Sequence, residues 1–298
     1  MSVFGRATFS AAGYAAARPS YPASLFKTVL AHHNDGPKGF LLDLGCGHGL
    51  VAREMSPRFD RVMGVDMSAG MIKQASSMTD DANTTFRQGG AEDLSFVPDG
   101  SVDMAVAGQS AHWFDYARAW PELARVVRPG GSLAFWGYKD NVLVGHPRAN
   151  QVLDQFCYAD DEGMKRYWEQ PGRERVRNLL RDVEPPAAEW QDVKRILYDV
   201  QGDVAEVPDD AEGAWMRKRI SLGELEAYLR TFSACQGWRD AHAQARSRAE
   251  GGEGDLADMM MDRVVASEPE WKAMGERWRD AEVETVWGTY ILLAKRRI

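Results

Sequence analysis

A short apolar run that ends in an acid and continues into a cluster of glycines most restricts how this 298-residue chain can fold. The run Gly39–Leu44 (GFLLDL) has the length and composition of a buried strand, and His48–Ser56 has the pattern of a following helix. Gly45, Gly47 and Gly49 lie in and beside the connection. Glycine permits a sharp turn and a close approach of the backbone to a ligand, which a Cβ atom would block. The segment therefore predicts a strand, a ligand-binding turn and a helix of an α/β sheet.

The rest of the first half extends this pattern. Short apolar runs alternate with longer amphipathic segments up to Tyr138, as in βαβ units around a parallel sheet. We divide the chain into a core with an N-terminal lid segment (1–138), a helical insertion or cap (139–190), and remaining core strands with further cap helices (191–298). The cap is expected over the carboxyl edge of the sheet, where open α/β sheets bind ligands. Further strands are expected at Arg61–Asp66, Thr85–Gln88, Val102–Ala107, Ser132–Tyr138, Val193–Tyr198 and Glu284–Ala294.

Composition narrows the functional class. The net charge is −8, and the basic segment Met216–Ile220 is short and expected to be a solvated face, so nucleic acid is a disfavoured partner. The three cysteines, Cys46, Cys157 and Cys235, form no CxxC pair, so neither a disulfide framework nor a metal site is expected. The N-terminus lacks the apolar segment of a signal peptide, and no run approaches the roughly 18 apolar residues of a membrane span. We expect a cytoplasmic protein without membrane partners.

An acid two residues before the first glycine distinguishes this turn from a dinucleotide-binding turn. The dinucleotide fingerprint has glycines at its first, third and sixth positions, and counting from Gly45 the sixth is Leu50. The Asp43 carboxylate would repel a pyrophosphate. S-adenosyl-L-methionine instead has an amino-acid end whose protonated amine could pair with Asp43, directly or through water. The glycines alone are also compatible with a simple tight turn.

Two later strand ends support a nucleoside ligand. Asp66 ends the next predicted strand about 20 residues after the turn, where an acid can accept hydrogen bonds from both ribose hydroxyls. Gly90–Leu94 (GAEDL) follows the third strand, and Glu92 or Asp93 could accept a hydrogen bond from the exocyclic amine of adenine. A solvated acidic turn is the alternative for that segment. Together the three elements predict S-adenosyl-L-methionine as the cofactor.

In order and spacing, these segments resemble the class I methyltransferases of the methyltransferase-11 type. The similar segments are LLDLGCGHG, VMGVDMS, GAEDLSF, AVAGQSAHWFD and ELARVVRPGGSLAFWGY. More narrowly, the chain resembles the fungal trans-aconitate methyltransferase group through Tyr14–Pro22, His112–Asp115 (HWFD), Tyr167–Gly172 and Leu222–Trp238. The resemblance is weakest over Ala241–Arg279.

The resemblance implies a Rossmann-like seven-stranded methyltransferase sheet of order 3-2-1-4-5-7-6, with an antiparallel last strand and a mostly helical cap. It also implies an intracellular monomer or weak dimer, and contacts to the cofactor from Tyr14 and Arg18 of the N-terminal segment and from Gln109 after the fourth strand. The complete expected cofactor site is Tyr14, Arg18, Asp43, Gly45, Cys46, Gly47, Asp66, Met67, Ala91, Glu92, Asp93 and Gln109.

The acceptor side is less defined. His112 follows the fourth strand at the mouth of the expected site and is the candidate catalytic base, with a structural histidine as the alternative. A carboxylic acid has an aqueous pKa of about 4, so at neutral pH it is already anionic and needs no base. It does need a cationic partner. The expected acceptor-binding residues are His112, Trp113, Trp136, Tyr138 and Trp168. Core packing is the alternative role for each of the aromatic residues among them. The candidate cations of the cap are Arg148, Lys165, Arg166 and Arg173.

The sequence thus predicts an S-adenosylmethionine-dependent methyltransferase whose partner is a small-molecule methyl acceptor. The expected methylated atom is an oxygen, of a carboxylate or hydroxyl, in an organic acid or secondary metabolite. Methylation of carbon, nitrogen or sulfur in a secondary metabolite is one alternative. A non-catalytic regulator that binds the cofactor is another.

Overall fold

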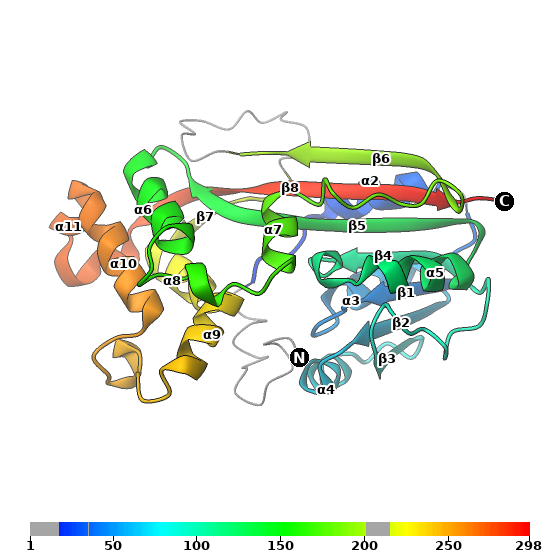
Figure 1. Ribbon diagram of the computed structural model, residues 1–298, viewed down its shortest axis with the longest axis horizontal. Coiled ribbons are helices and arrows are strands. Elements are labelled where there is room, and N and C mark those ends of the chain that lie inside the picture. Colours follow the sequence, from blue (N-terminus) through cyan, green and yellow to red (C-terminus); the bar gives the residue numbers. More distant parts are fainter. Residues whose placement is uncertain (1–17, 35, 201–214) are drawn as a thin grey trace.

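The computed structural model describes residues 18–34, 36–200 and 215–298, and its strands form one mixed sheet (Figure 1). The strand order is β3-β2-β1-β4-β5-β8-β6, and β7 also pairs with β8. Neighbouring strands from β3 to β5 are parallel, whereas β8 is antiparallel to β5, β6 and β7. The strands are β1 (Phe40–Leu44), β2 (Arg61–Asp66), β3 (Thr84–Gln88), β4 (Val102–Gly108), β5 (Val127–Leu143), β6 (Trp190–Tyr198), β7 (Arg217–Ser221) and β8 (Glu282–Arg296).

This arrangement confirms the predicted fold, because the strand predicted as the seventh and antiparallel is β8. The described part of the chain has eight strands, one more than predicted. The additional strand is β7, which includes most of the basic segment expected to be only a solvated face. It pairs with β8 through its backbone, and charged side chains on an edge strand do not prevent such pairing.

Strand β5 is longer than expected and continues from the core into the cap. After a register shift between Tyr138 and Asn141 it continues to Leu143, still paired with β8. The partner strand β4 ends at Gly108, opposite Trp136. Tyr138 and the residues after it therefore extend past the carboxyl edge of the parallel strands, where the ligand site of such a sheet lies.

Helices cover both faces of the sheet. Helix α5 packs on one face through Ala119, Trp120, Leu123 and Val126. Helices α2 and α3 pack on the other face in a second apolar cluster that contains Phe26 and Met55. Ser68 caps α4 as expected, since its hydroxyl accepts a hydrogen bond from the Met71 N–H at 3.3 Å. These helices are α2 (Ala23–His33), α3 (Leu50–Met55), α4 (Ala69–Ser77) and α5 (Tyr116–Val126).

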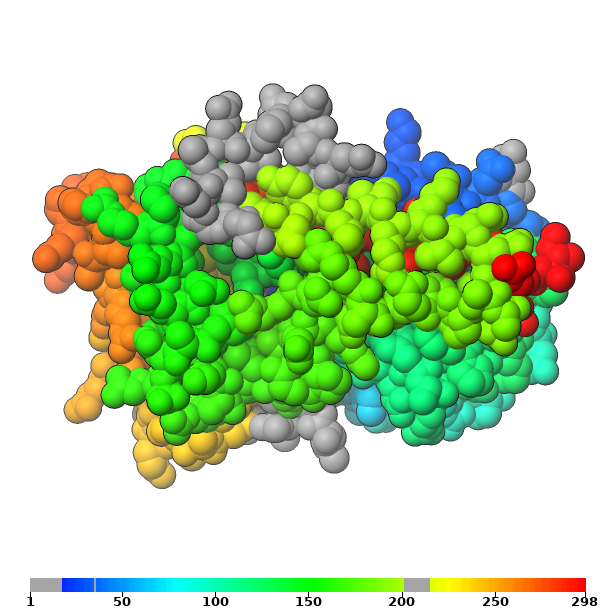
Figure 2. All heavy atoms as spheres, turned by 45° about the horizontal axis from the view of Figure 1, so that its top comes forward, coloured from blue at the N-terminus to red at the C-terminus, as the bar shows by residue number. Residues whose placement is uncertain are grey.

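Most of the remaining helices gather at one end of the sheet, whereas α7 (Gly172–Arg177) lies nearer its middle (Figure 1). Except for α7, which packs against β5, the remaining helices share an apolar cluster with the ends of β5, β7 and β8. In Figure 2, the segment of α6 and α7 (green) covers the face beside the edge strand β6 (yellow-green). None of the described helices is long and apolar enough to cross a membrane. The helices at this end are α6 (Pro147–Tyr158), α8 (Leu222–Arg230), α9 (Ser233–Ala241), α10 (Leu256–Ser267) and α11 (Pro269–Ala273).

Candidate functional site

A cavity of about 360 Å³ opens at the carboxyl ends of β1, β2 and β4, below the cap. Core segments that follow the strand ends form one side, and side chains of the cap form the other. We call it the site cavity. Its core lining includes Asp43, Gly45, Cys46, Gly47, Asp66, Met67, Ala91, Glu92, Gln109 and Ser110, and its lining on the cap side includes Tyr138, Lys139, Asp140, Trp168, Arg173, Tyr228 and Phe232.

The glycine turn is held against the end of β2. The N–H groups of Gly45 and Cys46 both donate to the Val65 carbonyl, at 2.7 and 3.0 Å. Gly45 and Gly47 have φ angles of +66° and +54°, in the left-handed region that favours glycine. A Cβ atom on Gly45 would collide with Ser110, whereas one on Gly47 would meet nothing within 4 Å. Gly45 is therefore required for packing, and the open space at Gly47 allows a ligand to approach the backbone.

Asp43 is a buried carboxylate with no cationic partner in the described part of the chain. It has 0% exposure, and neither of its carboxylate oxygens makes a hydrogen bond to a described residue. Burial, reinforced by the nearby Asp66 carboxylate and opposed in part by the Ala52 N–H, raises the pKa of Asp43 to about 7. Such a group in a cavity is matched by a cationic ligand atom, and the ammonium of an amino-acid end fits.

Asp66 is held in place at the end of β2. Its two carboxylate oxygens accept hydrogen bonds from the N–H groups of Gly47 (2.9 Å) and Ser68 (2.8 Å). Burial raises the pKa of Asp66, and these two donors oppose the shift. Each carboxylate oxygen can accept a further hydrogen bond, so the group fits a pair of ribose hydroxyls. The adjacent Met67 has 66% exposure and lines the cavity.

The segment after β3 contributes one of its two acids. Glu92 lines the cavity and accepts a hydrogen bond from the Asp115 N–H at 2.9 Å. Asp93 is exposed and outside the lining, and its carboxylate accepts a hydrogen bond from the Ser95 N–H instead. The buried Ala91 lies on the cavity wall. Tyr14, expected at the amino-acid end, lies outside the described residues.

Gln109 lines the cavity but uses its amide to hold the cap strand. Its Nε2 donates to the Tyr138 carbonyl at 2.8 Å, and its Oε1 accepts from the Tyr138 N–H at 2.7 Å. This paired contact replaces strand pairing beyond the end of β4 and fixes the position of Tyr138. A Cβ atom on Gly137 would collide with the Gln109 amide oxygen and the Tyr290 hydroxyl, so glycine at this position leaves room for the paired contact.

His112 lies on the wall of the cavity between core and cap. It has 6% exposure, and its Nδ1 makes no hydrogen bond to a described residue. Burial, with Arg173, Arg18 and Arg175 nearby, lowers the pKa of His112 to about 3. The imidazole is therefore neutral at physiological pH, and it is too weak a base to take a proton from a neutral phenol or ammonium group.

Two arginines, Arg18 and Arg173, line the cavity beside His112. Arg18 was predicted to contact the cofactor near its amino-acid end, and in the structure it lies against the cap residues Tyr138 and Tyr228. The Arg18 guanidinium donates to the Tyr138 hydroxyl at 3.3 Å and lies 5.3 Å from the centre of the Tyr228 ring. The Arg173 guanidinium bonds to the Asp140 carboxylate and the Tyr158 hydroxyl. Both side chains line the cavity close to His112, as the pKa shift of His112 indicates.

Of the four candidate cap cations, only Arg173 lines the site cavity. Arg148 pairs with Glu268 at 2.9 Å, Lys165 pairs with Asp161 at 3.6 Å, and Arg166 is exposed. The sequence did not distinguish them because all four lie in similar charged segments. Only the packing of α7 against the loop after β4, where Gly172 contacts the Trp113 ring, directs Arg173 inward.

Trp113, Tyr138 and Trp168 line the cavity as expected, but Trp136 does not. Trp136 is fully buried, and its ring packs edge-on against Tyr21 and Phe26, with centroid distances of 5.8 and 6.1 Å. Trp136 still lies opposite the last residue of β4, beneath α2, whereas Tyr138 extends past it. Tyr228 and Phe232, which also line the cavity, were not predicted because nothing in their local sequence marks them.

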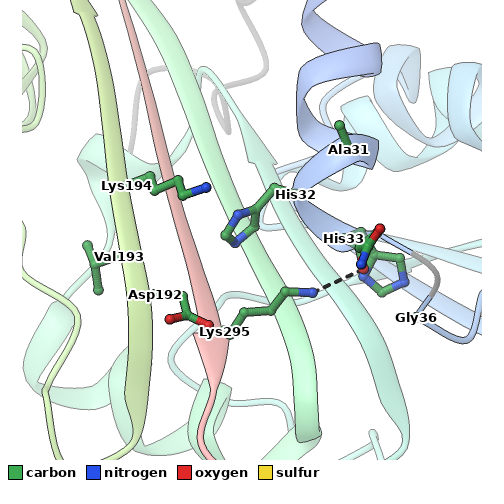
Figure 3. A pocket seen from close by; sticks show the side chains of 9 residues that line it. Ala31, His32, His33, Gly36, Asp192, Val193, Lys194 and Lys295 are labelled. Atoms are coloured by element: carbon green, nitrogen blue, oxygen red, sulfur yellow. Dashed lines mark hydrogen bonds between the residues drawn. The ribbon is translucent and has the colours of Figure 1, made fainter.

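A separate pocket of about 550 Å³ lies at the opposite edge of the sheet, between α2 and the strands β6 and β8 (Figure 3). Lys295 crosses it and donates to the His33 carbonyl and the Ser132 hydroxyl, at 3.0 and 2.9 Å. Ser132 is opposite Met104 near the amino ends of the parallel strands, away from the site cavity. A lysine on the last carbonyls of a helix stabilises that helix end, so this pocket has a structural explanation.

Comparison with known proteins finds methyltransferases among the similar chains. Residues 42–135 match the family described as the methyltransferase domain. A probable S-adenosylmethionine-dependent methyltransferase of Saccharomyces cerevisiae is 27% identical over 243 residues, which cover 77% of this chain and 81% of the relative. A methyltransferase of Aspergillus terreus is 28% identical, with 62% of each chain covered. An uncharacterized methyltransferase of Mycobacterium bovis is 36% identical over 44% of this chain and 51% of its own length.

A solved structure from Anaeromyxobacter dehalogenans, described as a type II methyltransferase, is similar over nearly the whole chain. It is 27% identical and superposes with a TM-score of 0.61, covering 93% of this chain and 97% of the other. The similarity therefore includes the cap as well as the sheet. The chain spans less than two thirds of the length of the Aspergillus and mycobacterial relatives.

Proposed function

We propose that this S-adenosylmethionine-dependent methyltransferase transfers the methyl group to a carboxylate oxygen of a small organic acid or acidic secondary metabolite. The observation that carries the proposal is the combination of two arginines, Arg18 and Arg173, with the neutral, buried His112 at one side of the site cavity. The arginines suit an anionic acceptor, and the histidine does not suit an acceptor that must lose a proton. The remaining cap residues would exclude water and nucleic acid from this side.

The cofactor would occupy the core side of the cavity. Asp43 would pair with its ammonium, Asp66 would accept from the ribose hydroxyls, and Met67, Ala91 and Glu92 would surround the adenine. When bound, the cofactor supplies an electrophilic methyl group on a sulfonium. The chain's own residues then have to hold a nucleophile in line with that methyl group, and positioning alone supplies much of the barrier reduction.

A carboxylate acceptor is consistent with the charges on the cap side. Arg173 is already hydrogen-bonded to Asp140 and Tyr158, so its guanidinium is held in place before the acceptor binds. Trp168 packs on the same guanidinium, whose carbon lies 3.9 Å from the ring centre. A guanidinium fixed in this way can orient a carboxylate by paired hydrogen bonds and leave one oxygen to attack the methyl group.

The His112→Ala variant should keep most of its activity. Because the pKa of His112 is lowered to about 3, no histidine titration should appear in the rate between about pH 5 and pH 9. We expect kcat to fall by no more than about tenfold, through loss of packing beside the acceptor. Steady-state rates of both proteins across this pH range test the prediction. A loss of about 1,000-fold together with a pH limb that disappears in the variant would indicate a base-dependent acceptor instead.

Cofactor affinity should rise with pH up to about 7, because Asp43 must be ionised to pair with the ammonium. Below its pKa the free protein holds a proton on Asp43, and a bound ammonium would expel it. S-adenosylhomocysteine, which has the same amino-acid end, should bind about 30-fold more weakly at about pH 5.5 than at about pH 8. Calorimetry in two buffers should detect the released proton, and Asp43→Asn should abolish that release. Proton release that persists in the variant would refute this assignment.

Release of S-adenosylhomocysteine from the cofactor in the presence of carboxylic acids, phenols and amines tests the acceptor class. Turnover with acids supports the proposal. Turnover only with phenols, amines or carbon nucleophiles would replace it with the corresponding O-, N- or C-methyl transfer. Cofactor binding without turnover on any of them would favour a non-catalytic regulator.

A further inference from the structure

A second, larger cavity adjoins the site cavity on the cap side. It has a volume of about 1450 Å³ and lies between α6, α7 and the end of β5, with Asp199 and Val200 after β6 closing one side. We call it the outer cavity. The site cavity, at about 360 Å³, is near the lower limit for a pocket that encloses one drug-sized ligand. A bound cofactor would fill most of it and leave room for little more than the reacting group of the acceptor.

The two cavities share part of their lining. Five residues line both of them, so the two cavities meet at a shared wall. Among them is Arg173, whose neighbour Tyr158 lines only the outer cavity. The shared residues are Lys139, Asp140, Trp168, Arg173 and Phe232.

The outer cavity has a buried apolar part and a charged rim. Val142, Leu153, Leu229 and Phe232 are each at most 7% exposed and line it. Arg173, which lines both cavities, is the proposed partner of the carboxylate. Each other basic side chain in the lining of the outer cavity has an acidic partner within salt-bridge distance, as in the pairs Lys139–Asp199 (2.5 Å), Arg181–Asp199 (2.9 Å), Arg177–Asp154 (3.7 Å) and Lys165–Asp161 (3.6 Å). A ligand there does not have to supply a charge, and the apolar part suits hydrocarbon or aromatic groups.

We propose that the outer cavity holds the body of the methyl acceptor, so that the acceptor is an elongated acid with an uncharged, largely apolar body. This proposal rests on the proposed function, because it places the carboxylate at Arg173 and the body beyond it. The acceptor lies across the shared wall, with Trp168 and Phe232 against the segment that joins its two ends. A small, highly polar acid would leave the apolar part of the outer cavity empty and is therefore a poorer substrate.

A series of acids measured with the full-length protein tests this inference. We expect kcat/KM to rise at least about tenfold from propanoate to phenylhexanoate, because each apolar group buried in a fitting pocket adds to binding. Leu153→Trp, which fills the floor of the outer cavity, should lower the ratio of kcat/KM for phenylhexanoate to that for propanoate by about tenfold. Gln151→Trp, at an exposed lining position on the same helix, provides a second variant if the buried substitution impairs folding.

Gln155→Trp is the matched control. Gln155 is exposed on α6, one turn after Gln151, and lines neither cavity. It should leave the substrate ratio unchanged. Equal kcat/KM values for short and long acids, or an unchanged ratio in both lining variants, would overturn the inference while leaving carboxylate methylation intact. Methylation of phenols or amines but of no acid would instead refute the proposed function itself.

Discussion

The Asp43→Asn variant should bind S-adenosylmethionine at least about 100-fold more weakly than the wild-type protein at about pH 8. Asp43 is fully buried, lines the site cavity and makes no hydrogen bond to the described residues. Asparagine keeps the shape of the side chain but removes the charge that would pair with the ammonium. Isothermal titration calorimetry with S-adenosylmethionine and with S-adenosylhomocysteine measures the loss, which should be similar for both because they share the amino-acid end.

The stability of this variant separates a binding role from a structural one. Because the pKa of Asp43 is raised to about 7, the folded protein holds a proton that the unfolded chain releases above about pH 4, and stability falls as the pH rises through that window. Asp43→Asn should therefore melt no lower than the wild type at about pH 8. Asp93→Asn, an exposed acid outside the lining, should keep its affinity within about twofold. Unchanged affinity in Asp43→Asn would overturn the placement of the ammonium.

The Arg173→Gln variant should lose about 100-fold in kcat/KM for a carboxylate acceptor, equivalent to about 2.7 kcal/mol of transition-state stabilisation. Glutamine can still donate a hydrogen bond but has neither the charge nor the paired donors of guanidinium. Arg173→Lys, which keeps the charge, should recover only part of the loss. Steady-state kinetics with saturating cofactor give the effect, and the cofactor affinity measured separately should change little.

Two controls address the partners of Arg173. Removing the guanidinium leaves Asp140 without its ion pair, so the double variant Arg173→Gln/Asp140→Asn shows whether the loss comes from repulsion by that carboxylate. Arg166→Gln removes an exposed cap arginine that lines neither cavity and should behave as wild type. Wild-type activity on acids in Arg173→Gln would exclude Arg173 as the acceptor's partner.

Much of the fold could be predicted because its signals are local. Most of the parallel strands contain a short apolar run followed by a polar or glycine-rich turn, as at Gly39–Leu44 and Arg61–Asp66. Strand β7 was missed because an edge strand needs only backbone partners and carries charged side chains, so its sequence has no apolar alternation. The length of β5 beyond Tyr138 was missed for a related reason, since a register shift interrupts its pattern.

In the candidate site, the residues on the core side of the cavity could be predicted from local sequence, whereas most of those on the cap side could not. Asp43, the glycine turn and Asp66 are close in sequence or lie at adjacent strand ends, and the structure gathers them around one cavity. Asp93 and Trp136 illustrate the limits of such reasoning. Asp93 is one residue past the cavity wall, and Trp136 is two residues short of the position from which Tyr138 reaches it. A local sequence pattern does not distinguish positions that lie one or two residues apart along the chain.

The alternating strands, the glycine turn after Asp43 and the acid Asp66 at the next strand end were sufficient to predict the sheet and the cofactor from the sequence. Parallel strands place their carboxyl ends along one edge, so residues that follow successive strands must meet there whatever the rest of the chain does. Only the tertiary structure decided the acceptor side. Arg18, Tyr138, Arg173 and Tyr228 come from four distant segments, and no local periodicity distinguishes Arg173 from Arg166. Their convergence depends on how the cap helices pack against the extended end of β5, which is a property of long-range contacts alone.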